Sequence, residues 1–267
     1  MFNECLHLDT HKALIHVFFS MRSTKRVEGV TDIGLAARPI RRVGVLGGGL
    51  MGSGIVTSLI LSGHEVLLKE VNEKFLNAGM DRIQSNLQSQ VKKGRLRKEA
   101  AAKAFSLVKG VLDYSAFNTL DLVIEAALED IPLKQQIFSD LERHCSSNCI
   151  LATNTSTIDI KIVGAKTHAA DRIVGAHFFS PAHLMPLLEI VRSDQTSKQV
   201  KCVLLSMAST ECSSATGPGG SVGVVIEHQE NSSPCRQLHW ICCQSCVLSI
   251  HHGCLFVSRS WSGSLSH

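Results

Sequence analysis

The chain has 267 residues, 44% of them hydrophobic, and a formal net charge of +4, which allows a sizeable core but provides too little charge for a nucleic-acid-binding surface. Its one dense basic run, residues 92–98, lacks aromatic neighbours that would stack on bases, so we expect a solvated helix end. No apolar run approaches the ~18 residues of a membrane span, and the N-terminus lacks the pattern of a signal peptide. The sequence therefore predicts a soluble globular protein with no nucleic-acid partner and no membrane span.

Residues 1–39 precede the first clear strand. Residues 1–22 are expected to form one amphipathic helix, and residues 23–39 a linker, because Gly29, Gly34 and Pro39 break any regular period. The α/β body is expected to start at Ile40.

Three glycines follow the first apolar strand. Gly47, Gly49 and Gly52 satisfy G-x-G-x-x-G, in which the glycines allow a tight turn, close approach of a pyrophosphate and close packing of the next helix. A helix over residues 50–61 and a strand over residues 65–69 then lead to Glu70, eighteen residues after Gly52. An acidic residue at this spacing binds the ribose 2′-hydroxyl and repels a 2′-phosphate, so the sequence predicts NAD as the cofactor.

The later elements alternate between helices and strands. Asn72 is expected to cap a helix that ends near Lys93, and Pro132 to lie in the first turn of a helix that ends near His144. A further helical piece is expected over residues 96–105, and strands over residues 107–112, 121–125, 149–152, 172–178 and 187–191, the last of which should close the sheet. This alternation predicts an α/β fold with a Rossmann-type, doubly wound parallel sheet.

Polar residues lie at the ends of the later strands, where an open α/β sheet binds ligands. They are Asn154-Thr-Ser156, His177 and Glu189. A histidine can take a proton from an alcohol, a carboxylate on its other nitrogen stabilises the imidazolium, and Ser156 could bond the reacting oxygen. The alternative for His177 is a hydrogen-bonded core histidine with no catalytic role.

These motifs together resemble one enzyme family. Gly-Gly-Gly-Leu-Met-Gly, Asn154-Thr-Ser-Thr157 and His177-Phe-Phe-Ser-Pro181, followed by Glu189, are similar to the NAD-binding domain of 3-hydroxyacyl-CoA dehydrogenases over residues 40–200. The resemblance implies that His177 is the catalytic base, Glu189 its carboxylate partner and Ser156 the residue that orients the substrate. An NADP-linked β-hydroxyacid dehydrogenase shares the glycine loop but not the His-Phe-Phe block, and Glu70 opposes it.

The resemblance also assigns binding residues. Lys93 matches a residue near the CoA of the acyl-CoA substrate, and Ser180 stands where the family more often has Asn. The residues expected to bind NAD are Gly47, Gly49, Leu50, Met51, Gly52, Glu70, Glu129, Lys134 and Ser156. Cys243-x-x-Cys246, beside the histidines at 239, 251 and 252, could be a zinc site or chance crowding in a non-native tail. A second ligand pair at regular spacing is absent, so no metal site is expected.

The front of the chain resembles a junction between two enzymes. His16-Val-Phe-Phe, Thr31-Asp32 and Gly34 are similar to the segment that joins the hydratase and dehydrogenase halves of plant-type peroxisomal multifunctional β-oxidation proteins. Residues 1–39 are interpreted as a remnant of that junction, and no hydratase activity is expected. The resemblance implies a peroxisomal location, although Ser264-Leu-Ser-His267 is no peroxisomal signal; without one the location would be cytoplasmic.

Residues 201–267 depart from the family. Seven of the ten cysteines lie there, a distribution that favours free thiols in a reducing compartment, and no period indicates structure. In relatives this region holds a catalytic asparagine and a helical domain that mediates dimerisation, and residues 201–267 resemble neither. We therefore expect a disordered or non-native tail, lost dimerisation and impaired turnover. Back-translated and read one nucleotide later, Gln237-Leu-His-Trp-Ile-Cys-Cys-Gln244 can encode the family's Asn-Cys-Thr-Gly-Phe-Ala-Val, which indicates an out-of-frame tail. The alternative function is thus a non-catalytic NAD-binding fragment, or a misannotated or alternatively spliced product.

Overall fold

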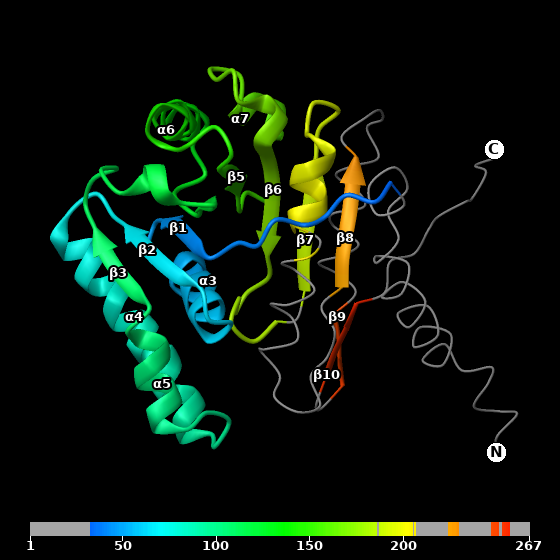
Figure 1. Cartoon of the computed structure of the whole chain (residues 1–267). Helices are drawn as coiled ribbons and strands as arrows, with labels where there is room; N and C mark the ends of the chain where they lie inside the picture. The colour runs from blue at the N-terminus through cyan, green and yellow to red at the C-terminus, as the bar shows by residue number, and fades with distance from the viewer. Residues whose placement is uncertain are drawn as a thin grey trace, which may run out of the picture. The chain divides into compact units, whose positions relative to one another are not determined.

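A computed structural model describes residues 33–185, 187–204, 206, 224–229, 247–250 and 253–256 (Figure 1). The chain divides into two units, Lys25–Glu230 and a second that joins Met1–Thr24 to Asn231–His267. The helix predicted over residues 1–22 lies outside the described residues. No helix in the described part of the chain is long and apolar enough to cross a membrane.

The first unit is built on an eight-stranded sheet with the order β3-β2-β1-β4-β5-β6-β7-β8. The strands are β1 (Arg42–Leu46), β2 (Glu65–Lys69), β3 (Val108–Val111), β4 (Leu122–Glu125), β5 (Ile150–Thr153), β6 (Ile173–Phe178), β7 (Leu187–Arg192) and β8 (Val224–Gln229). The order runs outward from β1 in both directions, so the chain switches direction between β1 and β4. That switch point is where doubly wound sheets bind their ligands, at the carboxyl ends of the strands.

Helices cover both faces of this sheet (Figure 1). They are α3 (Leu50–Leu61), α4 (Glu73–Lys92), α5 (Lys98–Phe105), α6 (Ile131–His144), α7 (Ile160–Val163) and the short 3₁₀ turns η1 (Phe117–Thr119) and η2 (Ala170–Arg172). Successive strand residues alternate between two cores: Leu122 and Ile124 pack with α3, α4 and α5, whereas Val123 packs with α6 and α7. This two-sided burial explains why the strands read as continuous apolar runs.

The predicted helix starts are confirmed. The side chain of Asn72 accepts a hydrogen bond from the backbone N–H of Phe75 at the start of α4. Asp130 accepts one in the same way from Leu133, and Pro132 lies in the first turn of α6, where its missing N–H removes no helical bond.

The sheet is parallel at every pairing except one. β6 and β7 pair antiparallel, with Ala176 opposite Ile190. The predicted Rossmann-type, doubly wound sheet is confirmed, and this one pair departs from its parallel arrangement. The reason is the short connection between the two strands: its described residues, 179–185, contain no crossover helix that could carry the chain back to start a parallel strand.

The structure also contains strands in the region for which the sequence indicates no period. A helical segment covers residues 198–204. β8 pairs parallel with β7, so β7 is not the last strand as predicted. In the second unit, β9 (Val247–Ile250) and β10 (Gly253–Phe256) form an antiparallel pair. The cysteine and histidine positions weighed as zinc ligands, 239, 243, 246, 251 and 252, lie outside the described residues.

Candidate active site

The glycine loop between β1 and α3 is shaped by close backbone contacts. Gly47 has φ +95°, and a Cβ on it would lie 2.7 Å from the Ala126 carbonyl oxygen. A Cβ on Gly52 would lie 1.7 Å from the carbonyl oxygen of Gly47, so neither position accepts a side chain. A Cβ on Gly49, the N-cap of α3, would meet nothing within 4 Å. This open space over a helix N-terminus fits a pyrophosphate group.

The first two residues of α3 border the same opening. Leu50 is 74% exposed, although it is a large apolar residue, and Met51 is half-buried. The prediction that both residues line a cofactor fits this exposure, because a bound dinucleotide would cover them.

The Glu70 carboxylate lies beside the glycine loop. It accepts hydrogen bonds from the backbone N–H groups of Gly48 at 2.5 Å and Val71 at 3.1 Å. Arg82 on α4 donates to the Gly48 carbonyl oxygen at 3.1 Å, a contact that no sequence motif indicated. Glu70 thus stands at the carboxyl end of β2, the position from which an acidic residue binds an adenosine ribose.

His177 and Glu189 face each other across β6 and β7, where they are directly paired. His177 Nδ1 lies 3.2 Å from Glu189 Oε2, and the two side chains are only 11% and 9% exposed. The antiparallel pairing of β6 with β7 brings these two side chains together, since opposite residues on neighbouring strands project to the same face. The arrangement can hold one imidazole tautomer and stabilise the imidazolium with a buried carboxylate.

The loop after β5 connects this pair to the centre of the sheet. The Asn154 side chain accepts a hydrogen bond from the backbone N–H of Phe178 at 2.8 Å. The backbone N–H of Asn154 donates to the Glu125 carbonyl oxygen, also at 2.8 Å. Ser156 lies two residues further along, half-buried. The loop that carries Ser156 is therefore fixed to the strand that carries His177.

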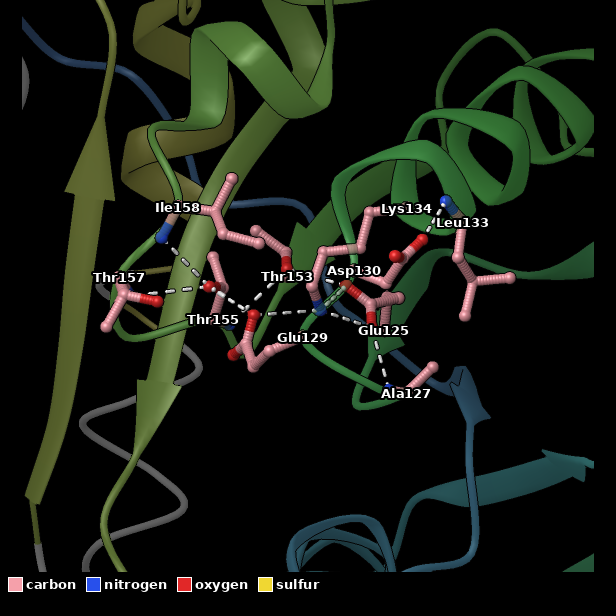
Figure 2. A network of polar contacts seen from close by, with 10 residues as sticks. All are labelled: Glu125, Ala127, Glu129, Asp130, Leu133, Lys134, Thr153, Thr155, Thr157 and Ile158. Carbon is pink, nitrogen blue, oxygen red and sulfur yellow. Dashed lines mark hydrogen bonds and ion pairs between the residues drawn. The ribbon is translucent and has the colours of Figure 1, made fainter.

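A buried ionic network lies behind the same loop (Figure 2). Lys134 Nζ lies 2.8 Å from both oxygens of Glu125, and the two side chains are 1% and 0% exposed. Glu129, by contrast, is 46% exposed; its Oε2 accepts a hydrogen bond from Thr155 Oγ1 at 2.9 Å and lies 3.6 Å from Lys134 Nζ. Of the two residues predicted to line the NAD site, Glu129 lies at the surface and Lys134 lies beneath it.

Glu125 and Thr153 belong to no sequence motif that indicated a function. Thr153 Oγ1 donates to Glu125 Oε2 at 2.7 Å, which joins the ends of β4 and β5. The available signal was the acidic residue at the end of the apolar strand at 121–125, because a carboxylate there needs a buried partner.

Lys93 follows the last turn of α4 and is exposed. Burial lowers the pKa of the half-buried His183, and the positive charge of Lys93 lowers this pKa further. His183 Nδ1 is buried and has no hydrogen-bond partner in the structure. The structure thus brings the predicted CoA-side lysine near a histidine in the connection between β6 and β7.

Comparison with known proteins identifies similar chains. A family model described as "3-hydroxyacyl-CoA dehydrogenase, NAD binding domain" matches residues 42–210. The glyoxysomal fatty acid beta-oxidation multifunctional protein of Cucumis sativus is 59% identical over 206 residues, which are 77% of this chain and 28% of that protein. The peroxisomal counterpart of Arabidopsis thaliana is 60% identical over 205 residues, again 77% of this chain and 28% of that protein. The chain therefore spans just over a quarter of the length of these relatives.

A solved structure gives the same indication. The crystal structure of 3-hydroxybutyryl-CoA dehydrogenase from Escherichia coli K12 aligns with a TM-score of 0.65 and 31% identity, over 73% of this chain and 39% of that one. Residues 211–267 lie beyond the match to the family model.

Proposed function

The chain belongs to the 3-hydroxyacyl-CoA dehydrogenase family, whose NAD-binding domain it carries over residues 42–210, and from this premise we propose that it oxidises (S)-3-hydroxyacyl-CoA to 3-oxoacyl-CoA in fatty-acid β-oxidation. The observation that supports this proposal most strongly is the buried pair of His177 and Glu189 at 3.2 Å. A bound NAD would accept the hydride from the carbon that carries the hydroxyl group.

The residues of this chain would hold that cofactor at the switch point of the sheet. The space over Gly49 would hold the pyrophosphate, and Glu70 would bind the adenosine ribose hydroxyls. Glu129, exposed on the loop after β4, belongs to the half of the sheet, β4 to β6, that also carries Ser156 and His177. Leu50 and Met51, at the start of α3, would contact the cofactor.

His177 handles the proton. Its Nδ1–H donates to Glu189, so the other ring nitrogen, Nε2, takes the proton of the substrate hydroxyl as the C=O bond forms. Glu189 stays ionised and stabilises the imidazolium, which later gives the proton to water. Ser156 donates a hydrogen bond to the reacting oxygen and keeps it in line with His177.

The substrate and the location follow from the relatives. We propose that Lys93 binds the CoA portion of the substrate, and that the chain acts in the peroxisome, as the names of its plant relatives state for them. We also propose that dimerisation is lost, because the sequence of residues 201–267 does not resemble the helical domain that mediates it in relatives.

The extent of the family match favours a second candidate function, the binding of NAD without turnover. The family model ends at residue 210, and the described strands after it, β8 to β10, do not belong to the matched domain. In this case the chain would hold the dinucleotide but lack the groups that complete the substrate pocket.

A turnover assay distinguishes the two functions. NADH formation is followed by absorbance with the full chain, NAD⁺ and (S)-3-hydroxybutyryl-CoA, alongside the variant His177→Gln. We expect turnover by the wild type and a loss of ~10²–10⁴-fold in the variant, since a general base contributes that much. Equal rates would exclude His177 as the base. Saturable NADH binding without turnover by the wild type would favour the second function.

A further inference from the structure

We propose that Glu125 is a positioning residue that fixes the cofactor loop to the catalytic strand, and that Lys134 holds the Glu125 carboxylate in the orientation this requires. This inference rests on the proposed function, because it concerns how the same site is held. It assigns a role to Glu125, which ends β4 at the centre of the sheet.

Both carboxylate oxygens of Glu125 are used, and the donors come from three different segments (Figure 2). Oε1 accepts from the backbone N–H of Ala127 at 2.7 Å, and Oε2 accepts from Thr153 Oγ1 at 2.7 Å. Lys134 Nζ, from the first turn of α6, lies 2.8 Å from each oxygen. One side chain thus connects the loop after β4, the end of β5 and the start of α6.

The first connection leads to the cofactor loop. Ala126, which stands between Glu125 and Ala127, donates its N–H to the Leu46 carbonyl oxygen at 2.9 Å. Its own carbonyl oxygen lies 2.7 Å from the position of a Cβ on Gly47, so the loop after β4 packs against the first glycine. A shift of the Ala127 backbone would therefore move the floor of the glycine loop.

The second connection leads to the catalytic strand. The Glu125 carbonyl oxygen accepts from the Asn154 N–H at 2.8 Å, while Thr153 is bonded to the Glu125 carboxylate. The Asn154 side chain in turn accepts from the N–H of Phe178, the neighbour of His177 in β6. Loss of the carboxylate would loosen β5 relative to β4 and misplace His177 relative to the cofactor.

The burial of Lys134 decides how it acts. Its side chain is 1% exposed, and its ammonium group lies on Glu125, with Glu129 Oε2 further away at 3.6 Å. A buried ammonium group is tolerated only while its counter-ion is present. Lys134 therefore orients the Glu125 carboxylate so that one oxygen faces Ala127 and the other faces Thr153.

A double-mutant cycle on NADH affinity tests this role. NADH is titrated by its fluorescence into the full chain and into Glu125→Gln, Lys134→Met and the double variant, each below its melting temperature. We expect each single change to weaken NADH binding about tenfold, because a misplaced binding loop loses affinity of that order. In the Glu125→Gln background, Lys134→Met should cause a smaller loss than it does in the wild-type background, because the carboxylate that Lys134 orients is already gone.

Two more variants keep the test informative if the buried changes impair folding. Thr153→Val removes one bond to Glu125 and leaves the ion pair intact, and should weaken NADH binding about threefold, as expected for one hydrogen bond. Lys161→Met removes the exposed contact of Lys161 with Asp194 at 3.2 Å and should leave NADH affinity unchanged.

The possible outcomes distinguish failure of this inference from failure of the proposed function. Equal losses from Lys134→Met in both backgrounds would show that Lys134 acts independently of Glu125 and overturn the inference, as would wild-type affinity in Thr153→Val. A wild-type chain that binds no NADH would overturn the proposed function first, and this inference with it.

Discussion

Two alanine substitutions in the glycine loop should separate the shape of the loop from its ability to bind a dinucleotide. In Gly52→Ala the new methyl group would lie 1.7 Å from the Gly47 carbonyl oxygen, whereas real contacts of this kind are at least 3.0 Å, so the backbone must move by the difference, 1.3 Å. In Gly49→Ala the methyl group meets no atom within 4 Å. It occupies only the space in which we place the pyrophosphate.

The magnitudes follow from these distances. Overpacking costs ~1–3 kcal/mol, which lowers the melting temperature by about 2–12 °C for a domain of this size. A displacement of about an ångström in the loop should also weaken NADH binding by ~10²-fold. Gly49→Ala should leave the melting temperature within about 2 °C of wild type, since substitutions at open positions cost less than ~0.5 kcal/mol, but should weaken NADH binding at least about tenfold.

The assay combines thermal unfolding without ligand and NADH fluorescence titration on the same preparations. The expected pattern is a destabilised Gly52→Ala and a stable Gly49→Ala, both of which bind NADH weakly. Wild-type NADH affinity in Gly49→Ala would show that no phosphate lies over the N-terminus of α3. Wild-type stability and affinity in Gly52→Ala would contradict the contact with Gly47.

Three other outcomes are expected. Glu189→Gln should lower kcat about 10²-fold with NADH affinity within about twofold of wild type, because the amide can bond His177 Nδ1 but cannot stabilise an imidazolium; an unchanged kcat would remove Glu189 from the mechanism. Glu70→Ser should weaken NADH about tenfold or more and narrow the preference over NADPH, since a charge-assisted bond is lost; an unchanged ratio of the two affinities would contradict this role. Burial raises the pKa of Tyr114, the only tyrosine of the chain, to about 12. Its ultraviolet titration should therefore have a midpoint near 12 when folded and near 10 in denaturant. Because the folded state binds more protons between these values, Tyr114 contributes a loss of stability as the pH rises from about 10 to about 12, and a folded midpoint near 10 would refute its burial.

Much of the fold could be predicted because local signals and burial agree. Asn72 and Pro132 mark helix starts, and continuous apolar strands report burial on both faces of a parallel sheet. The reversal between β6 and β7 was missed because strand direction depends on the length of a connection, which the hydrophobic period does not encode. β8 was missed because residues 224–229 lie in a region without a clear pattern of their own.

The candidate site was predictable where a motif fixes the geometry. The glycine spacing and Glu70 follow from the demands of the dinucleotide, and the His-Phe-Phe block carries the resemblance. The roles within the network around Glu125 were not predictable. From the sequence alone, Glu125 and Glu129 are equivalent candidates as partners of Lys134. Only burial shows that Lys134 and Glu125 pair beneath the surface while Glu129 faces outward.

The central claim is that this chain holds NAD on the loop beside Glu70. The most direct test is fluorescence titration of the wild-type full chain with NADH and, in parallel, with NADPH. We expect saturable binding of NADH that is at least about tenfold tighter than that of NADPH, because the carboxylate bonds a ribose hydroxyl and repels a phosphate. Absence of NADH binding, or tighter binding of NADPH, would contradict it.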